Sequence, residues 1–558
     1  MYYVNDMASL QSALESSDNI INIILTDSFQ LTYAVLINKG KTVIITSDND
    51  GPYTLTGNVI RVIDGNIIIN DGVIIINDTV SVSAYALHLN GSSASGTIKG
   101  GRFEGYTALR IENGATIDEI SGGEFIGASS AIELFGQNSK IDLISNGLFE
   151  KTDATIDRSA FYVDNGAQIG YIVGGTFEAK INSALLLIRG GWVDEISNGT
   201  FNGQRAMTVF SDDVPKTGVD RISGGKFTGE AVCVWVRGVG AQINTISNGT
   251  FEGVRTLHND LGSVTSNITG GNFIGSTAGI YNLSTIENIG GTVQISGIIN
   301  DNIDGTVYGT IDNISGGVII SDVPDKNGIR NLGLINQITG GIIVGAESSI
   351  SCVSPDKPET GTIGKILGGA FWGKNDAAII LASTLILEPG LDVDPGIGRY
   401  RGKDDVIFND ESLVIYPPGY IMSTSTLPVE ETQFRYLTRE NEDECEGNIK
   451  FPCIEFTEEG VFNYTIRETS TSGNGWITDE KKYPVIVTVT DDNGTLTASV
   501  EYPEGIPEFT NRYEPQAVCV TLCANKIAIG APLEDGQFTF GVFDEEGNEV
   551  TSATNTTP

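Results

Sequence analysis

Apolar residues in the first 400 positions of the chain come in short runs that alternate with polar residues. Three such runs near the N-terminus cover residues 43–45, 67–69 and 73–76. Alternation over a few residues is typical of β-strands whose two faces meet different surroundings. The pattern therefore predicts a domain built almost wholly from short strands.

One segment at the N-terminus follows a different pattern. Met7, Leu10 and Leu14 are spaced three and four residues apart, as on one side of a helix, and Asp6 or Ser9 can cap its first turn. We predict a short amphipathic helix here that covers the first turn of the following structure.

A repeated unit dominates the first two-thirds of the chain. Its consensus is Ile-x-(Gly/Asn)-Gly-x-Phe-x-Gly, and twelve copies follow one another at intervals of 20 to 28 residues. The aromatic position is filled in turn by Phe103, Phe125, Phe149, Phe177, Phe201, Phe227, Phe251, Phe273, Val293, Ile319, Ile343 and Phe371. A strand-rich period near 24 residues predicts one coil of a parallel β-helix per repeat, whereas helical repeats need 33 residues or more. About 14 coils at ~4.8 Å each would give a solenoid roughly 65 to 70 Å long, with phenylalanines stacked inside.

These features together resemble a known superfamily. The N-terminal helix, residues 22–26 and the Gly-Gly-x-Phe coils are similar to the pectate-lyase-like right-handed parallel β-helix, in the form found on Gram-positive surface adhesins. The resemblance covers residues 1–400. It implies a fold, but it implies no activity, because β-helices include lyases, hydrolases, tailspikes and binding proteins.

The chain changes character after residue 400. Alternating strands between turns predict a β-sandwich over residues 401–515, and the order of these strands resembles the Gram-positive pilin domains that form an internal isopeptide bond. The resemblance implies Glu468 as the catalytic acid and Asn511 as the amide partner. The first strand carries Arg435 where the family has its lysine, so we expect no complete bond.

Residues 516–558 resemble the start of a second pilin-like domain. Lys526 stands where the family has its lysine, but its asparagine partner would lie beyond Pro558. We expect a poorly packed tail and no bond at Lys526.

Composition and charge narrow the classes of function. The 558 residues include 33 Lys and Arg against 71 Asp and Glu, a formal net charge of −38. Such an excess of negative charge repels nucleic acid and anionic membranes, and no run of 18 apolar residues occurs that could cross a bilayer. Six scattered cysteines and two histidines show no metal-ligand spacing, so we expect no metal and no cofactor. We interpret the sequence as part of a longer extracellular, cell-surface protein whose signal peptide and covalent wall anchor lie outside it.

One face of the predicted solenoid carries apolar residues where polar ones belong. Strict alternation places them outside, with Cys233 in the column of Tyr162 and Trp235 in the column of Phe210. The predicted strip consists of Phe135, Tyr162, Leu186, Ile188, Phe210 and Trp235, flanked by Arg189, Arg205, Arg237, Asp212 and Asp213. Aromatic rings beside charged groups suit sugars, so a glycan or a protein on another surface is the predicted partner. A loop or a second domain that covers the strip is the alternative.

Three functions stay open at this point. The first is an adhesin that presents the β-helix on a stalk. The second is a polysaccharide lyase or hydrolase, for which Asp164, Asp212, Asp213, Asp220, Arg205 and Arg237 are the candidates, although no two carboxylates form a recognisable motif. We therefore assign no catalytic residues. The third is a structural spacer.

Overall fold

The chain forms two compact units, Met1–Cys445 and Glu446–Pro558, and each is described by itself. The computed structural model describes residues 1–353 except 80, 83, 157, 213–215, 304–306 and 322–325. Beyond residue 353 it describes residues 361–373, 377–381, 385–387, 400–402, 407–408, 414–416, 419–422, 459–468, 476–479, 481–492, 495–501, 503, 509, 512–513, 534–543 and 549–556.

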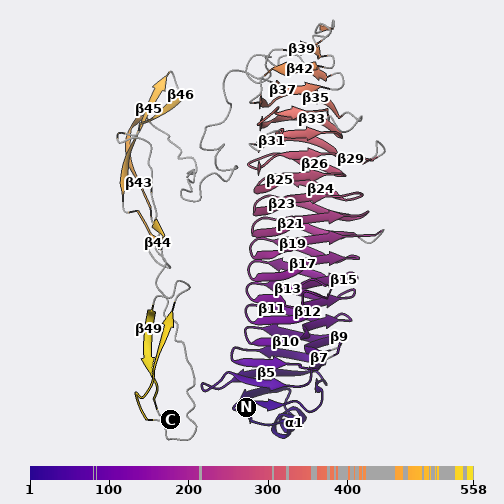
Figure 1. Cartoon of the computed structure of the whole chain (residues 1–558), viewed down its shortest axis with the longest axis vertical. Coiled ribbons are helices and arrows are strands. Elements are labelled where there is room, and N and C mark those ends of the chain that lie inside the picture. Colours follow the sequence, from indigo (N-terminus) through magenta and orange to yellow (C-terminus); the bar gives the residue numbers. More distant parts are fainter. Residues whose placement is uncertain are drawn as a thin grey trace. The chain divides into compact units, whose positions relative to one another are not determined.

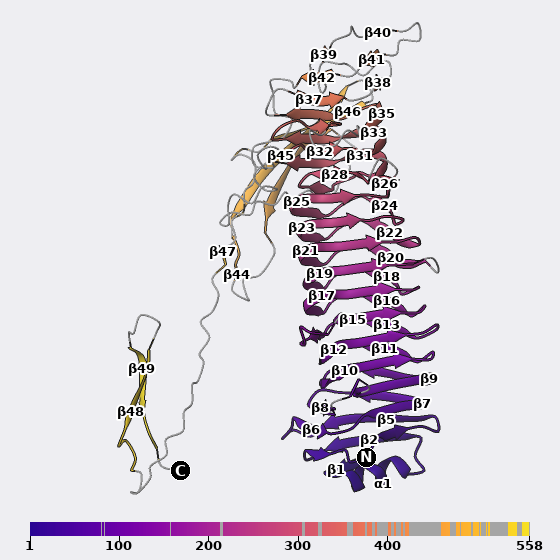
Figure 2. The ribbon, with the colours of Figure 1, turned by 45° about the vertical axis from the view of Figure 1, so that its right-hand side comes forward.

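The first unit is a parallel β-solenoid, as predicted, with about 15 turns where the repeat predicted about 14. Each turn passes through three sheets, which run along the length of the stack (Figures 1 and 2). We call them the isoleucine sheet, the phenylalanine sheet and the third sheet, after the residues that fill their inner columns. Several long strands turn a corner and belong to two sheets.

The isoleucine sheet begins with β1 (Tyr2–Val4), which pairs with β2. Its further strands are β2 (Ile20–Leu25), β5 (Lys41–Ser47), the second parts of β7 (Ile60–Ile69) and β9 (Tyr85–Ile98), β11 (Thr116–Ile120), β13 (Lys140–Ile144), β16 (Gln168–Ile172), β18 (Trp192–Ile196), β20 (Thr217–Ile222), β22 (Ala241–Ile246), β24 (Val264–Ile268), β26 (Thr285–Ile289), the first parts of β31 (Thr310–Ser321) and β33 (Leu334–Gly345), β35 (Thr362–Ile366) and β38 (Leu385–Leu387).

The phenylalanine sheet follows the isoleucine sheet in each turn. Its strands are β3 (Phe29–Gln30), β6 (Tyr53–Thr56), β8 (Val73–Ile76), the first parts of β10 (Arg102–Glu112), β12 (Glu124–Phe135), β17 (Thr176–Ile188), β19 (Thr200–Phe210), β21 (Lys226–Arg237), β23 (Thr250–Asn259) and β25 (Asn272–Asn282), then β14 (Leu148–Lys151), β27 (Gln294–Ile295), the second parts of β31 and β33, and β36 (Ala370–Gly373).

The third sheet completes each turn. It contains β4 (Val35–Ile37), the first parts of β7 and β9, the second parts of β10, β12, β17, β19, β21, β23 and β25, and β15 (Phe161–Asp164), β28 (Ile298–Asn300), β32 (Ile329–Asn331), β34 (Ile350–Ser351) and β37 (Ala377–Leu381). A small antiparallel pair, β29 (Asn302–Ile303) and β30 (Val307–Tyr308), follows β28.

The phenylalanines stack inside the solenoid as the repeat predicts. From Phe103 to Phe273, neighbouring rings lie nearly parallel with centroids 4.5 to 5.2 Å apart, and all are fully buried. One assignment from the sequence was wrong, because Phe273 pairs with Ile295 rather than with Val293. That turn has one extra residue between its isoleucine, Ile289, and the stacked position, so the consensus spacing misplaces the column.

A column of buried asparagines continues the inner row of the third sheet. Asn259, Asn282, Asn300 and Asn331 lie in register on successive turns, and none of their side chains is exposed to solvent. The amide nitrogens of the first three donate to the side-chain oxygen of the next asparagine, at 2.9, 2.8 and 2.8 Å. All four nitrogens also donate to backbone carbonyls at the start of the isoleucine sheet, so the ladder joins adjacent turns and closes a corner.

Both ends of the solenoid carry additional structure. Helix α1 (Met7–Glu15) begins at the predicted cap: the Ser9 amide donates to Asp6 at 2.7 Å, and Leu10 and Ala13 are buried in the same core as the first coils. This confirms the capping helix. At the other end β41 (Val414–Tyr416) and β42 (Gly419–Met422) pair antiparallel with β38 and β37, and β39 (Tyr400–Gly402) and β40 (Ile407–Phe408) extend them. Antiparallel strands here occupy an edge that parallel coils leave open.

The second unit is also built from β-strands. β43 (Gly460–Arg467), β45 (Lys482–Asp492) and β46 (Thr495–Glu501) form an antiparallel sheet whose inner valines, Val485, Val487 and Val489, are buried. Two further pairs are β44 (Trp476–Ile477) with β47 (Arg512–Tyr513) and β48 (Thr539–Phe543) with β49 (Glu549–Thr554). In the last pair Phe540 and Val550 are exposed.

Candidate functional site

The outer face of the third sheet holds the residues of the predicted strip, in two columns. Tyr162, Leu186 and Trp235 lie in the first column, with Thr208 between the last two. The second column contains Phe135, Asp164, Ile188, Phe210 and Arg237. The six apolar residues of the predicted strip therefore share one face, and their role in binding stays a prediction.

Two positions in this face differ from the prediction. Trp235 belongs to the first column and not to that of Phe210, where Arg237 lies instead. Cys233 points into the core and is fully buried. The cause is an irregularity of β21 between Gly229 and Val232, which adds one residue relative to β19 and shifts every later side chain.

The strip is less accessible than exposed rings would be. Tyr162 is only 8% exposed, and Phe135, Leu186, Ile188, Phe210 and Trp235 are half-buried. The guanidinium of Arg158, from the segment between β14 and β15, lies over the Tyr162 ring at 4.9 Å. Tyr162 is therefore covered by its own chain, and the accessible part of the strip is centred on Phe210 and Trp235.

Arginines are stacked on the aromatic rings of this accessible part. Arg205 and Arg237 lie over the Trp235 ring at 4.8 and 5.2 Å from its centroid, and Arg237 also lies 5.7 Å from that of Phe210. The indole nitrogen of Trp235 donates to Asp260 at 3.1 Å. Stacking fixes the guanidinium planes, and the Arg237 side chain is 53% exposed and forms an ion pair with Asp260 at 3.9 Å. Such a surface offers flat apolar area together with oriented hydrogen-bond donors.

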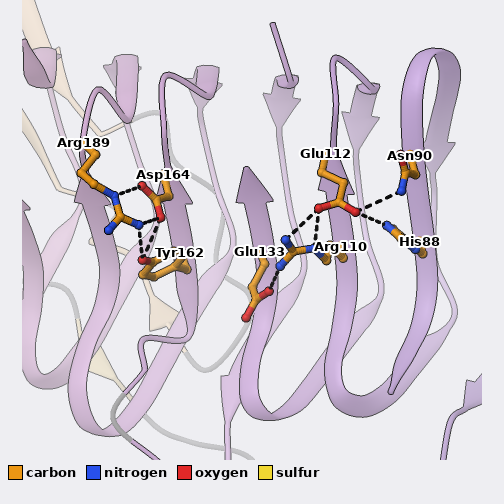
Figure 3. A network of polar contacts seen from close by, with 8 residues as sticks. All are labelled: His88, Asn90, Arg110, Glu112, Glu133, Tyr162, Asp164 and Arg189. Carbon is orange, nitrogen blue, oxygen red and sulfur yellow. Dashed lines mark hydrogen bonds and ion pairs between the residues drawn. The ribbon is translucent and has the colours of Figure 1, made fainter. Parts of the chain in front are cut away.

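A charged network lies on the same face, nearer the N-terminus (Figure 3). Glu112 accepts hydrogen bonds from His88 at 2.9 Å, Asn90 at 3.0 Å and Arg110 at 2.7 Å, and Arg110 also bonds Glu133. The His88 contact is the largest cause that lowers the pKa of Glu112 to about 2; burial opposes it, and Arg110 adds to it. Glu112 is therefore a fixed anion at neutral pH rather than a proton donor.

Two of the predicted catalytic carboxylates, Asp164 and Asp220, lie on different sheets. Asp164, 1% exposed, bonds Arg189 and accepts from the Tyr162 hydroxyl at 2.9 Å (Figure 3). Asp220 lies in β20 of the isoleucine sheet, where Asn244 donates to it at 2.6 Å. Asp212 is exposed, and Asp213 lies outside the described residues. Within the described part of the chain no three His, Cys, Asp or Glu side chains are grouped so that they could hold a metal ion.

The site extends further toward the C-terminus than the sequence analysis placed it. His258 and Tyr281 continue the first column beyond Trp235, with ring centroids 6.0 Å and then 4.9 Å apart. Burial lowers the pKa of His258 to about 4, so it is neutral at physiological pH. Arg255 lies 4.1 Å over Tyr281, which repeats the arginine–aromatic stacking. The signal was available, because aligning the turns after Phe251 and Phe273 brings these residues into one column.

The buried thiols have no place in this site. Cys233 and Cys352 are free and buried, and burial raises the pKa of Cys352 to about 12. The other four cysteines lie outside the described residues.

Comparison with known protein families identifies one region of the chain. Residues 422–514 match the family described as Spy0128-like isopeptide containing domain, FctA. The match confirms a pilin-like domain after the β-helix and points to a Gram-positive surface or pilus protein, whose pilin-type domain is structural rather than enzymatic. No curated protein and no solved structure matches the chain. No helix in the described part of the chain is long and apolar enough to cross a membrane.

The isopeptide candidates are only partly described. Glu468 follows β43 and is half-buried, while Asn511 and Lys526 lie outside the described residues. Glu468 and Asn511 lie within the matched region, and Lys526 lies after it. The domain limits 1–400, 401–515 and 516–558, and the incomplete second domain, stay predictions.

Proposed function

We propose that this protein is an adhesin that binds a glycan through the outer face of the third sheet, while the pilin-like domain forms part of a stalk. The observation that carries the proposal is the stacking of Arg205 and Arg237 on Trp235 beside Phe210. An outward-facing strand in a chain of net charge −38 would ordinarily carry polar and acidic side chains here.

The chemistry of this surface suits sugars. Apolar area around Phe210 and Ile188 can contact the C–H faces of a pyranose, and stacked guanidinium groups can donate to its hydroxyls and ring substituents. The face runs parallel to the solenoid axis at ~4.8 Å per turn, so an extended polymer can contact several turns at once.

A glycan array followed by titration of the best ligand tests the proposal. Trp235→Ala removes the platform under both arginines, and we expect at least a tenfold loss of affinity. Tyr171→Ala is the matched control, because Tyr171 is an exposed aromatic, 52% accessible, on the isoleucine sheet. Equal glycan affinity of both variants would show that the strip is not the binding surface.

A product assay on the bound polymer separates binding from catalysis. We expect no release of reducing ends or unsaturated products, because Asp164 bonds Arg189 and Glu112 is held by His88 and Arg110. Turnover that the Trp235→Ala exchange abolishes would instead indicate a polysaccharide-degrading enzyme.

The pilin-like domain has its own test. We propose that it carries no isopeptide bond, because Arg435 stands where a lysine is required. The intact mass should equal that of the sequence. Loss of one ammonia that disappears in a Glu468→Ala variant would show that another lysine makes the bond.

A further inference from the structure

A second feature of the third sheet is a pocket that lies past Tyr281. It has a volume of about 340 Å³, and its walls come from β23, β25, β28, the end of β31, β32, and the residues Gly297, Lys326 and Asn327. This volume is at the lower end of the range for small-molecule sites, which suits one small chemical group or a single sugar. Arg330 lies in the same column as Trp235, four turns further on, about 19 Å at ~4.8 Å per turn.

The walls of this pocket are positively charged. Arg255, Lys326 and Arg330 line it, and none of its described lining residues is acidic. Asp301 bonds Arg330 at 3.2 Å from outside the lining and also accepts from Tyr281 at 3.0 Å. Among the described residues, three cations therefore meet one nearby carboxylate, that of Asp301, although the chain as a whole has a charge of −38. Distant charges are screened within about 8 Å at physiological salt.

The cations are incompletely satisfied within the described part of the chain. The Nε of Arg330 is buried and has no hydrogen-bond partner among the described residues. Lys326 donates to the Thr277 carbonyl at 3.3 Å, and burial, followed by the charge of Arg330, lowers its pKa. A buried donor without a partner costs free energy that a bound acceptor would recover.

The three cations reach the pocket from two segments of the chain. Arg255 comes from β23 and stacks on Tyr281, Arg330 comes from β32, and Lys326 precedes that strand. Two guanidinium groups and one ammonium carry more donors than the two coplanar oxygens of a carboxylate need, so they match the several oxygens of a tetrahedral anion better.

We propose that this pocket binds a tetrahedral oxyanion, a sulfate or phosphate ester carried by the glycan that the adhesin recognises. The identity of the carrier rests on the proposed function, whereas anion binding by the pocket does not. The proposal assigns a specificity subsite at one end of the strip.

Calorimetric titration of the whole chain in chloride buffer is the first experiment. The probes are inorganic sulfate, inorganic phosphate and acetate, and we expect the first two to bind at least tenfold more tightly than acetate. A preference for sulfate or for phosphate identifies the type of ester. Equal binding of acetate would overturn the tetrahedral assignment.

Two variants of equal charge locate the site. Lys326→Gln should weaken sulfate or phosphate binding at least tenfold, whereas Arg221→Gln, on the outer face of the isoleucine sheet, should change it less than twofold. An equal loss of anion affinity in both variants would show that only the overall charge of the protein matters, and it would overturn the proposal. A Lys326→Gln protein with an unchanged thermal transition excludes misfolding as the cause.

Polymers then link the pocket to the glycan. Dextran sulfate should bind more tightly than dextran, and Lys326→Gln should remove that difference. If the anions bind the pocket but no polymer binds the strip, the proposed function fails and the pocket assignment stands. If a neutral glycan binds through Trp235 and no anion binds the pocket, the function stands and this inference fails.

Discussion

Burial decides how much a charged side chain on the solenoid contributes to stability. Glu112, His88 and Arg110 have side chains 17%, 4% and 19% exposed, so water screens their contacts little. Arg102 and Glu124, on the phenylalanine sheet, make a similar contact but are 41% and 48% exposed. Exposed pairs of that kind contribute at most about 1 kcal/mol. Loss of the Glu112 network should therefore be measurable.

The pH dependence of the free energy of unfolding should reveal the contribution of ionised Glu112. Its folded pKa of about 2 lies below the ordinary 4.5, so its contribution is complete above pH 4.5 and is lost as the pH falls toward 2. We expect Glu112→Gln to lower the free energy of unfolding by about 2 to 3 kcal/mol at pH 7, and the difference from the wild type to shrink steeply between pH 4.5 and 2. Urea unfolding at a series of pH values measures both.

A control variant separates this effect from a general change of charge. Asp118→Asn removes the same charge at an exposed position of β11 and should cost less than about 0.5 kcal/mol at pH 7. A Glu112→Gln variant whose deficit persisted unchanged at pH 2 would show that its cost is one of packing rather than of ionisation.

At the scale of whole elements, the asparagine ladder connects neighbouring turns by side-chain hydrogen bonds where the phenylalanine column ends. The last stacked phenylalanine pair is Phe251 with Phe273, and the following turns carry Ile295 and Ile319 in that column. The ladder from Asn259 to Asn331 covers the same turns. Buried hydrogen bonds between amide side chains fix the register of neighbouring strands in these turns. Aliphatic side chains do not, because they can replace one another in a stack.

Removal of one rung should destabilise these turns. Asn282 donates to Asn300 and to two backbone carbonyls and accepts from Asn259. Asn282→Ala leaves several buried groups without partners, and we expect a loss of about 2 to 4 kcal/mol. Hydrogen exchange should show the loss as faster exchange of the amides in β25 and β28.

A matched variant tests burial as the cause. Asn313 donates to Asn288 at 3.2 Å on the outer face of the isoleucine sheet, so Asn313→Ala removes the same kind of bond near solvent. We expect a cost below about 1 kcal/mol and local exchange only. Equal costs for both variants would contradict the argument.

The repeat predicts elements well and registers less well. The repeat period near 24 residues located the coils, because each coil places one large apolar residue, such as Phe201, in the inner column of the phenylalanine sheet. It misplaced Val293, Cys233 and Trp235, because one extra residue in a turn shifts all later side chains and leaves no trace in composition. It could not show that Arg205 covers Trp235, since this stacking depends on a contact between neighbouring turns.

At the scale of the whole molecule, a solenoid depends on its ends. Each turn contacts only its neighbours, so stability is close to a sum of turn and interface terms, and an uncovered end exposes apolar surface and unpaired strand edges. In the first unit, α1 places Leu10 and Ala13 against the first coils, and β41 and β42 pair with the last strands. The ends therefore control both fraying and association.

The N-terminal end offers the sharper test of this idea. Leu10→Asp places a carboxylate where a side chain 1% exposed now packs, and burying that charge costs more than the helix gains from docking. We expect α1 to detach, the first coils to fray, and the chain to associate through the exposed edge. Size-exclusion chromatography with light scattering measures the association, and hydrogen exchange in β1 and β2 measures the fraying. Ser12→Asp adds the same charge at an exposed position of the same helix and should leave the protein monomeric or unchanged in state. If Leu10→Asp behaved like Ser12→Asp, α1 would not be needed to protect the first coil. The edge strand β1 itself would then have to resist pairing with another chain.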